Sequence, residues 1–69
     1  MNSYTALVKH ERGWWYGWIE EVPGVNAQEP SRDELMVALK ECLSEAFEMN
    51  RREARKAAES DYSEETIAL

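Results

Sequence analysis

The stretch Ile19-Glu20-Glu21-Val22-Pro23-Gly24-Val25 decides the fold, because it joins two unlike halves of the chain. Before it lies an aromatic segment, Trp14-Trp15-Tyr16-Gly17-Trp18, whose composition is typical of a β-strand. Proline pre-sets φ and glycine takes the positive φ that other residues resist, so Pro23-Gly24 predicts a tight turn. The middle of the chain is therefore predicted to form a strand, a turn, a short strand and then a helix.

Two further segments complete the predicted sheet. β-formers are frequent from Ser3 to His10, which predicts a first strand. The polar connection Glu11-Arg12-Gly13 suits a hairpin that leads into the second strand, from Trp14 to Glu20. After the turn, Asn26 to Glu29 is expected to form a short third strand. We therefore expect a small antiparallel sheet.

A long helix follows, and Ser31 opens it. The Ser31 hydroxyl can cap the first turn, Glu34 completes a capping box, and acidic side chains there suit the helix dipole. At about 100° per residue, apolar side chains then recur on one face. They are Leu35, Leu39, Cys42, Ala46 and Met49. We expect the buried part to end near Met49 or Asn50, and residues 51–59 to continue as a solvated extension.

The last residues, from Tyr62 to Leu69, alternate weakly between polar and apolar side chains. The ending Thr66-Ile67-Ala68-Leu69 predicts either a last strand at the edge of the sheet or a frayed terminus. The predicted fold class is α+β, with a small antiparallel sheet packed on one long helix in a single domain over residues 1–69.

Length and charge restrict the possible partners. A chain of 69 residues has a marginal core, so self-association or a partner protein is expected to add stability. The formal charge of −6, from 14 acidic and 8 basic residues, repels phosphate backbones and favours a basic partner. The sequence has no apolar run of transmembrane length, no signal segment and a single cysteine, Cys42. These features predict a cytoplasmic protein without a membrane span.

Catalytic and metal-binding arrangements are missing from the sequence. His10 and Cys42 are the only soft ligands and lie far apart, and Cys42 falls on the apolar face of the helix. Glu20 and Glu21 are adjacent on a strand, so they point to opposite faces and cannot act as a carboxylate pair. No phosphate-binding loop or nucleophile motif is present. We predict a protein that is not an enzyme and uses no cofactor or metal.

The aromatic strand offers a first candidate binding surface. Gly17 has no side chain to obstruct the helix, so we assign its face to the core, together with Trp15 and Ile19. The opposite face then carries three large aromatic side chains, Trp14, Tyr16 and Trp18. One helix covers one side of a small sheet, so this face is predicted to be an interface unless the C-terminal segment closes it.

The polar side of the helix offers a second candidate surface. Four acidic side chains share one ridge of the helical wheel: Glu34, Glu41, Glu45 and Glu48. The ridge is either a hydrated face or a surface that meets a basic partner. The basic stretch from Arg51 to Lys56 lies at the far end of the helix, where Arg52 can pair with Glu48. We expect a solvated helix end there in preference to a nucleic-acid site.

Taken in order, these elements resemble the N-terminal domain of the HicB antitoxin family. The resemblance rests on four segments: Tyr4-Thr-Ala-Leu-Val8, Trp15-Tyr-Gly-Trp-Ile19, Val22-Pro23-Gly24-Val25 and Ser31-Arg-Asp-Glu-Leu35. It implies a β-β-β-α-β domain with a partial ribonuclease-H-like topology. The chain departs from the family at Val25, where cysteine is frequent. Because the sequence ends at Leu69, we expect a short form without the family's C-terminal DNA-binding domain.

The resemblance also implies a function. It implies that the chain neutralises a small basic toxin, of the HicA-like kind that cleaves mRNA, by direct protein–protein binding. The candidate contact residues are Trp14, Tyr16, Trp18, Glu41, Glu45 and Glu48. A second hypothesis is a stand-alone module that forms homo-oligomers through the aromatic face. Direct nucleic-acid binding is a third hypothesis, and the acidic charge argues against it.

Overall fold

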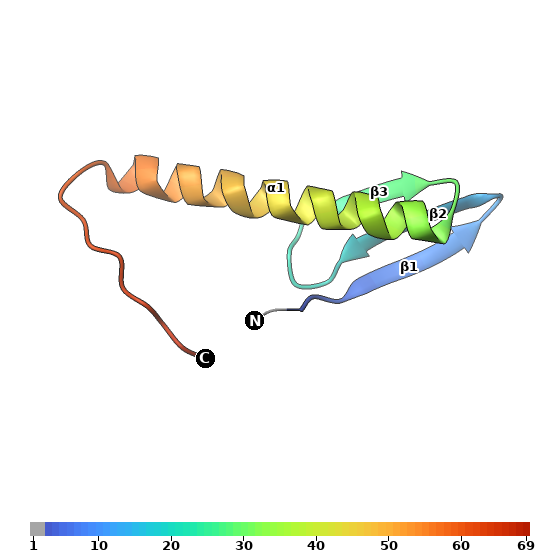
Figure 1. The fold of residues 1–69 in the computed structure, drawn as a ribbon, viewed down its shortest axis with the longest axis horizontal. Helices are drawn as coiled ribbons and strands as arrows, with labels where there is room; N and C mark the ends of the chain where they lie inside the picture. The colour runs from blue at the N-terminus through green and yellow to red at the C-terminus, as the bar shows by residue number, and fades with distance from the viewer. Residues whose placement is uncertain (1–2) are drawn as a thin grey trace.

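The computed structural model describes residues 3–69 as a three-stranded sheet followed by one long helix. The strands are β1 (Ala6–Glu11), β2 (Trp14–Ile19) and β3 (Asn26–Glu29), and the helix is α1 (Arg32–Ala58). Both strand pairs are antiparallel, in the order β1-β2-β3, and α1 lies across one face of the sheet (Figure 1). The α+β class, with an antiparallel sheet on one long helix, is confirmed.

A two-residue turn at Arg12-Gly13 joins β1 to β2. Both residues have positive φ, 54° and 83°, as a type I′ turn requires. The turn sets Glu11 opposite Trp14 and, further along, Leu7 opposite Trp18. The predicted hairpin therefore forms, but its loop is shorter than expected and β1 begins at Ala6.

The turn at Pro23-Gly24 forms as predicted. Gly24 has a φ of 90°, and the Val25 N–H donates to the carbonyl of Val22 at 3.4 Å. Proline at the second position and positive φ at the third define a type II turn. The Ile19 N–H also donates to the Val25 carbonyl at 3.0 Å, so the turn is tied to the end of β2.

Ser31 caps α1. Its backbone is extended, with a φ of −136°, and its hydroxyl accepts a hydrogen bond from the Glu34 N–H at 3.2 Å. At the other end, the Glu59 N–H donates to the Arg55 carbonyl at 3.0 Å. The predicted Ser31 cap and the predicted solvated extension are both present, whereas the hydrogen bonds of residues 3–69 include none from the Ser31 N–H to the Glu34 side chain that would complete a capping box. No helix within residues 3–69 combines the length and the apolar character that a membrane span needs.

The core lies where α1 packs over β2 and β3. Four apolar side chains are buried among residues 3–69: Ile19, Val25, Leu35 and Leu39. Cys42 and Ala46 extend this contact as half-buried side chains, whereas Met49 is 57% exposed, so the buried part of α1 ends earlier than predicted. Strands of 4 and 6 residues span roughly 13–20 Å and a helix of 27 residues roughly 40 Å, so the sheet supports only part of the helix.

The last strand expected after the helix does not form. Within residues 3–69 no strand follows Ala58, so the order is β-β-β-α. The helix carries the chain past the end of the sheet before the tail turns back (Figure 1). Ile67 is 84% exposed, and an ion pair of 3.3 Å between Arg55 and Glu64 ties the tail to the helix. Figure 1 shows the tail turned back beside the projecting part of α1, and none of its residues pairs with the sheet.

Gly17 lies on the core face, as predicted, but for a different reason. A Cβ at this position would lie 2.6 Å from the carbonyl oxygen of Leu7 on β1. Real Cβ atoms essentially never make so short a contact. The neighbouring strand, and not the helix, therefore excludes a side chain at Gly17.

Candidate binding surfaces

The sheet face turned away from α1 carries the predicted aromatic row. Trp14 and Trp18 are 46% and 41% exposed, and Tyr16 between them is half-buried. β1 adds Leu7, which pairs with Trp18 and is also 41% exposed. The tail does not close this face within residues 3–69. The row therefore stays in contact with solvent.

Polar side chains of β1 border the aromatic row. The Tyr16 hydroxyl donates to Glu11 Oε2 at 3.1 Å, and Lys9 Nζ lies 5.9 Å from the centre of the Tyr16 ring. The face is thus apolar where Trp18 meets Leu7 and polar around Tyr16. Exposed apolar groups with a polar border are typical of a surface that binds another protein.

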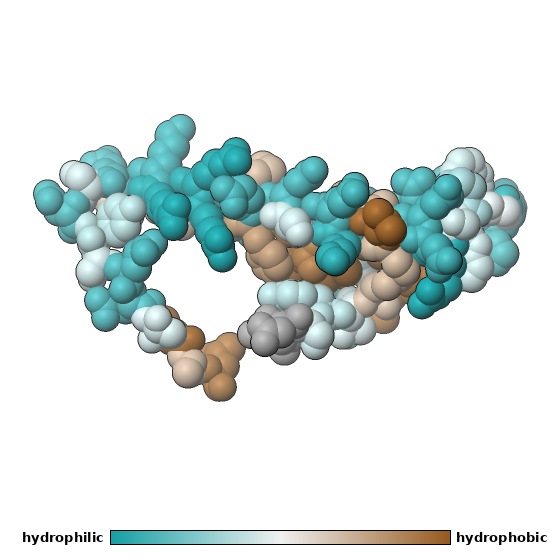
Figure 2. Space-filling view, in the orientation of Figure 1, coloured by the Kyte–Doolittle hydropathy of each residue, from teal (hydrophilic) through white to brown (hydrophobic). Residues whose placement is uncertain are grey.

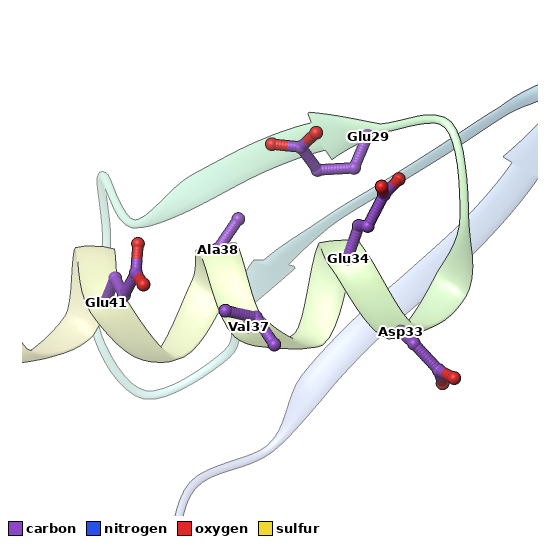
Figure 3. Close-up of a pocket in the computed structure, with 6 residues that line it drawn as sticks. All are labelled: Glu29, Asp33, Glu34, Val37, Ala38 and Glu41. Atoms are coloured by element: carbon purple, nitrogen blue, oxygen red, sulfur yellow. The ribbon is translucent and has the colours of Figure 1, made fainter.

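A second surface lies where α1 borders β3 (Figure 3). An open hollow of about 410 Å³ is lined there by Glu29, Asp33, Glu34, Val37, Ala38 and Glu41. Figure 3 shows the Glu34 side chain directed toward Glu29 on β3, Glu41 further along the helix, and Asp33 turned outward. We call Glu29, Glu34 and Glu41 the acidic flank. Its carboxylates surround apolar side chains of the helix.

The other two predicted helix residues continue away from this hollow. Glu45 and Glu48 are both exposed. Glu48 Oε1 lies 3.7 Å from Arg52 Nε, as the i,i+4 spacing predicted. Glu41 and Glu45 both line a neighbouring open hollow, together with Lys40. Glu41 therefore borders both hollows and belongs to the acidic flank, while Lys40 shares the second hollow with Glu41 and Glu45 and Arg52 pairs with Glu48.

Glu29 was not indicated by the sequence pattern. It lies on β3 opposite Trp15, so a helical wheel cannot include it. One feature of the sequence could have predicted its position beside the helix: only Pro30-Ser31 separates β3 from α1. So short a connection forces the first turns of the helix to lie beside the end of the strand. Acidic residues on both sides of such a connection are brought together by the topology.

The two surfaces lie on opposite sides of the sheet. Trp14, Tyr16 and Trp18 point away from α1, because the alternate residues Trp15 and Ile19 pack against the core below the helix. The acidic flank lies on the helix side. A partner that contacts both surfaces has to pass around the edge formed by β3.

The basic stretch from Arg51 to Lys56 lies exposed on the projecting half of α1. Figure 2 shows hydrophilic side chains over this half of the helix. Arg52 pairs with Glu48, and Arg55 Nη2 lies 3.3 Å from Glu64 Oε1. These acidic partners dilute the positive charge that a phosphate backbone would need.

His10 and Cys42 both take part in packing. The His10 ring stacks on Trp15, with ring centres 4.3 Å apart and planes 8° apart. Cys42 is a free, half-buried thiol that packs against the core. Within residues 3–69 no group of three His, Cys, Asp or Glu side chains is placed to hold a metal ion.

Glu21 ties the start of the chain to the turn after β2. The Thr5 N–H donates to Glu21 Oε1 at 2.8 Å, and the Glu20 N–H donates to the Thr5 carbonyl at 2.9 Å. Two hydrogen bonds from Thr5 lower the pKa of Glu21 below its ordinary value; the bond from the Thr5 backbone has the larger effect and the bond from the Thr5 side chain the smaller. The ionised carboxylate is therefore the form that holds this contact.

Comparison with known proteins does not assign the chain to a family. No protein-family model, no curated protein and no solved structure matches it.

Proposed function

We propose that the chain is a protein-binding module whose acidic flank binds a basic protein. One observation carries the proposal. Within residues 3–69, Glu29, Glu34 and Glu41 surround an open hollow, and no salt bridge compensates their charge. A cationic side chain placed among these carboxylates gains favourable Coulomb energy, and its aliphatic stem can lie on the apolar floor. The hollow suits a lysine or arginine of a partner.

The charge of the whole chain supports the same class of partner. A net charge of −6 attracts a cationic protein and raises the rate at which the two meet. The aromatic row on the other face offers a second contact for a partner that wraps around the β3 edge. Aromatic side chains supply much of the binding energy at protein interfaces.

The resemblance to HicB antitoxins makes the partner class more specific. We propose a small basic toxin that cleaves mRNA as the partner, and we propose that the chain acts by binding and not by catalysis. The toxin surface that binds RNA is expected to be cationic. The acidic flank would bind that same surface and so compete with RNA for it. The chain would neutralise the toxin by covering its RNA site.

Co-expression with the product of the neighbouring reading frame tests this function. That product is expected to stop growth when expressed alone, and to co-purify with the chain when growth is restored. The triple variant Glu29→Gln, Glu34→Gln, Glu41→Gln should bind at least about ten-fold more weakly at low salt, because it removes the charges that face the partner.

A matched control removes the same charge elsewhere. Glu53→Gln, Asp61→Asn and Glu65→Gln change exposed carboxylates on the projecting helix and the tail. This variant should bind almost as the wild type does. A neighbouring product that is harmless alone, or that binds both triple variants equally, contradicts the proposal.

Self-association through the aromatic face is the second candidate function. The observation that favours it is the exposed row of Trp14 and Trp18 with Leu7 beside it. The chain would then be a homo-oligomeric module without a toxin partner. Sedimentation separates the two functions, because a chain that stays monomeric at high micromolar concentration excludes this candidate and leaves toxin binding untouched.

A further inference from the structure

Among residues 3–69, no strand pairs with the outer edge of β1. β1 is 6 residues long and lies at one edge of the sheet, while α1 packs over β2 and β3 (Figure 1). An unpaired edge of this length is a template for another strand. The opposite edge is less suited to pairing, because β3 has 4 residues and ends at the charged Glu29 beside the helix.

Half of the β1 backbone groups point out of the sheet. The two-residue turn makes Glu11 and Trp14 a hydrogen-bonded pair. The alternation of an antiparallel ladder then directs the backbone N–H and C=O groups of Leu7 toward β2. The hydrogen bond of 2.9 Å from the Glu20 N–H to the Thr5 carbonyl follows the same alternation. The residues whose N–H and C=O groups point outward are Ala6, Val8 and His10.

An apolar hollow lies just inside this edge. It has a volume of about 160 Å³, and its walls include Ala6 at the start of β1 and Met36 and Leu43 on α1. Figure 2 shows apolar side chains gathered between the helix and the sheet. A strand added to β1 would cover the hollow with its own inward side chains. Pairing at this edge therefore buries apolar surface as well as satisfying backbone groups.

A second copy of the chain fits this edge better than the chain's own tail does. The tail forms no strand over residues 60–69, and the Arg55–Glu64 ion pair holds it to the projecting helix. β1 and its turn carry Lys9 and Arg12 against one acid, Glu11, in a chain of net charge −6. Two copies that meet along β1 avoid the like-charge repulsion that their acidic helices would impose.

We propose that two copies pair antiparallel through β1, with Leu7 on the two-fold axis. In this register Ala6 of each copy forms a hydrogen-bonded pair with Val8 of the other, and both residues direct their backbone groups outward. Val8 of one copy then lies at the mouth of the other copy's hollow. On the outer face, the two Leu7 side chains meet between the two Trp18 side chains, in one apolar row across the joined sheets.

Charge selects this register over the next one along the strand. With Val8 on the axis, the Lys9 side chains of the two copies would be diagonal neighbours on the same face. With Leu7 on the axis, Lys9 lies opposite Thr5 instead.

The acidic flank stays free in both copies, because it lies at the β3 edge. The pairing rests on self-association and does not depend on a toxin partner.

Sedimentation equilibrium of the full chain tests the pairing. The wild type is expected to dimerise, whereas Leu7→Lys places two like charges on the axis and should sediment as a monomer. Met49→Lys is the matched control, because Met49 is an apolar residue on α1, 57% exposed and beyond the buried part of the helix, and this variant should remain dimeric. A wild type that is monomeric at high micromolar concentration overturns both self-association and the pairing.

Cross-linking gives a test that does not depend on the folding of Leu7→Lys. In a Cys42→Ala background, Leu7→Cys brings two thiols to a non-hydrogen-bonded pair, where a Cα separation of about 4.5 Å permits a disulfide. Mild oxidation should then give a covalent dimer. Trp14→Cys, at the far end of the outer face, should give none. Any other pattern in a dimeric protein leaves self-association standing and overturns pairing at β1.

Discussion

At Gly17 the backbone of β1 leaves no room for a side chain, since a Cβ there would lie 2.6 Å from the Leu7 carbonyl oxygen. Gly17→Ala is therefore expected to lower the free energy of unfolding by about 1–3 kcal/mol, the usual cost of overpacking. Gly13→Asn is the control, because nothing lies within 4 Å of its Cβ position and asparagine tolerates positive φ. Urea unfolding measures both, and an unchanged stability of Gly17→Ala would contradict the close approach of β1.

A second prediction at this scale concerns Glu21, whose pKa is lowered by the hydrogen bonds from Thr5. Because the folded-state pKa lies below the ordinary value of 4.5, the stabilisation is present above pH 4.5 and is lost as pH falls through the folded-state pKa. Glu21→Gln removes this titration. The melting temperature of the wild type should therefore fall more steeply on acidification than that of Glu21→Gln.

The neighbouring carboxylate provides the control for this prediction. Glu20 is exposed, and its side chain does not accept the Thr5 hydrogen bond that Glu21 accepts. Glu20→Gln should therefore retain the acid-dependent loss of stability that depends on Glu21. Thermal unfolding at a series of pH values compares the three proteins. The interpretation fails if Glu21→Gln and Glu20→Gln show the same pH dependence.

At the scale of an element, Ser31 is the residue that fixes where α1 begins. Its hydroxyl accepts a hydrogen bond from the Glu34 N–H at 3.2 Å. If the hydroxyl is removed, the Glu34 N–H loses its hydrogen-bond acceptor at the capping residue. Ser31→Ala is expected to cost about 1 kcal/mol of stability. Ser44→Ala is the control, because Ser44 is exposed in the middle of the helix, where alanine is the better helix former. Chemical unfolding should separate the two variants, and equal stabilities would show that the cap contributes nothing.

The elements also differ in how much of them the sequence could predict. The bounds of β3 and the start of α1 follow from Pro23-Gly24 and Ser31, and the structure has both where they were predicted. The sequence did not predict where the buried part of α1 ends. The helical wheel places Met49 on the buried face, but Met49 is 57% exposed. A wheel describes the helix alone, whereas burial also depends on how far the sheet extends beneath it.

At the scale of the whole molecule, the chain is elongated, with dimensions of 52 × 24 × 15 Å, because α1 projects beyond its sheet. The tail contributes no strand within residues 3–69, and Ile67 is 84% exposed. Deletion of residues 60–69 is therefore expected to leave the melting temperature and the strand content nearly unchanged. Circular dichroism checks both quantities.

A shorter chain that also loses α1 residues gives the comparison for this deletion. Phe47 lies against Tyr4, with ring centres 5.3 Å apart, so a chain that ends at Ala46 loses this contact and should be measurably less stable. If removing residues 60–69 destabilises the fold as strongly, the tail pairs with the sheet in solution. The β-β-β-α order would then be incomplete.

The sequence by itself determined the turn, the cap, the strand order and the alternation of side chains along β2. Each of these depends on interactions between residues close in the chain: the φ preference of Pro23-Gly24, the hydroxyl of Ser31, and the period of two that separates Trp14 from Trp15. The alternation placed Trp14, Tyr16 and Trp18 together on one face without any knowledge of the tertiary fold.

Only the tertiary structure decided which groups from distant parts of the chain meet. It placed Glu29 beside Glu34 and Glu41, excluded a side chain at Gly17 through Leu7, and kept the tail away from the sheet. The aromatic row and the acidic flank lie on opposite sides of the sheet for the same reason. Such contacts depend on where α1 crosses the sheet and where its support ends, and neither is set by residues adjacent in sequence.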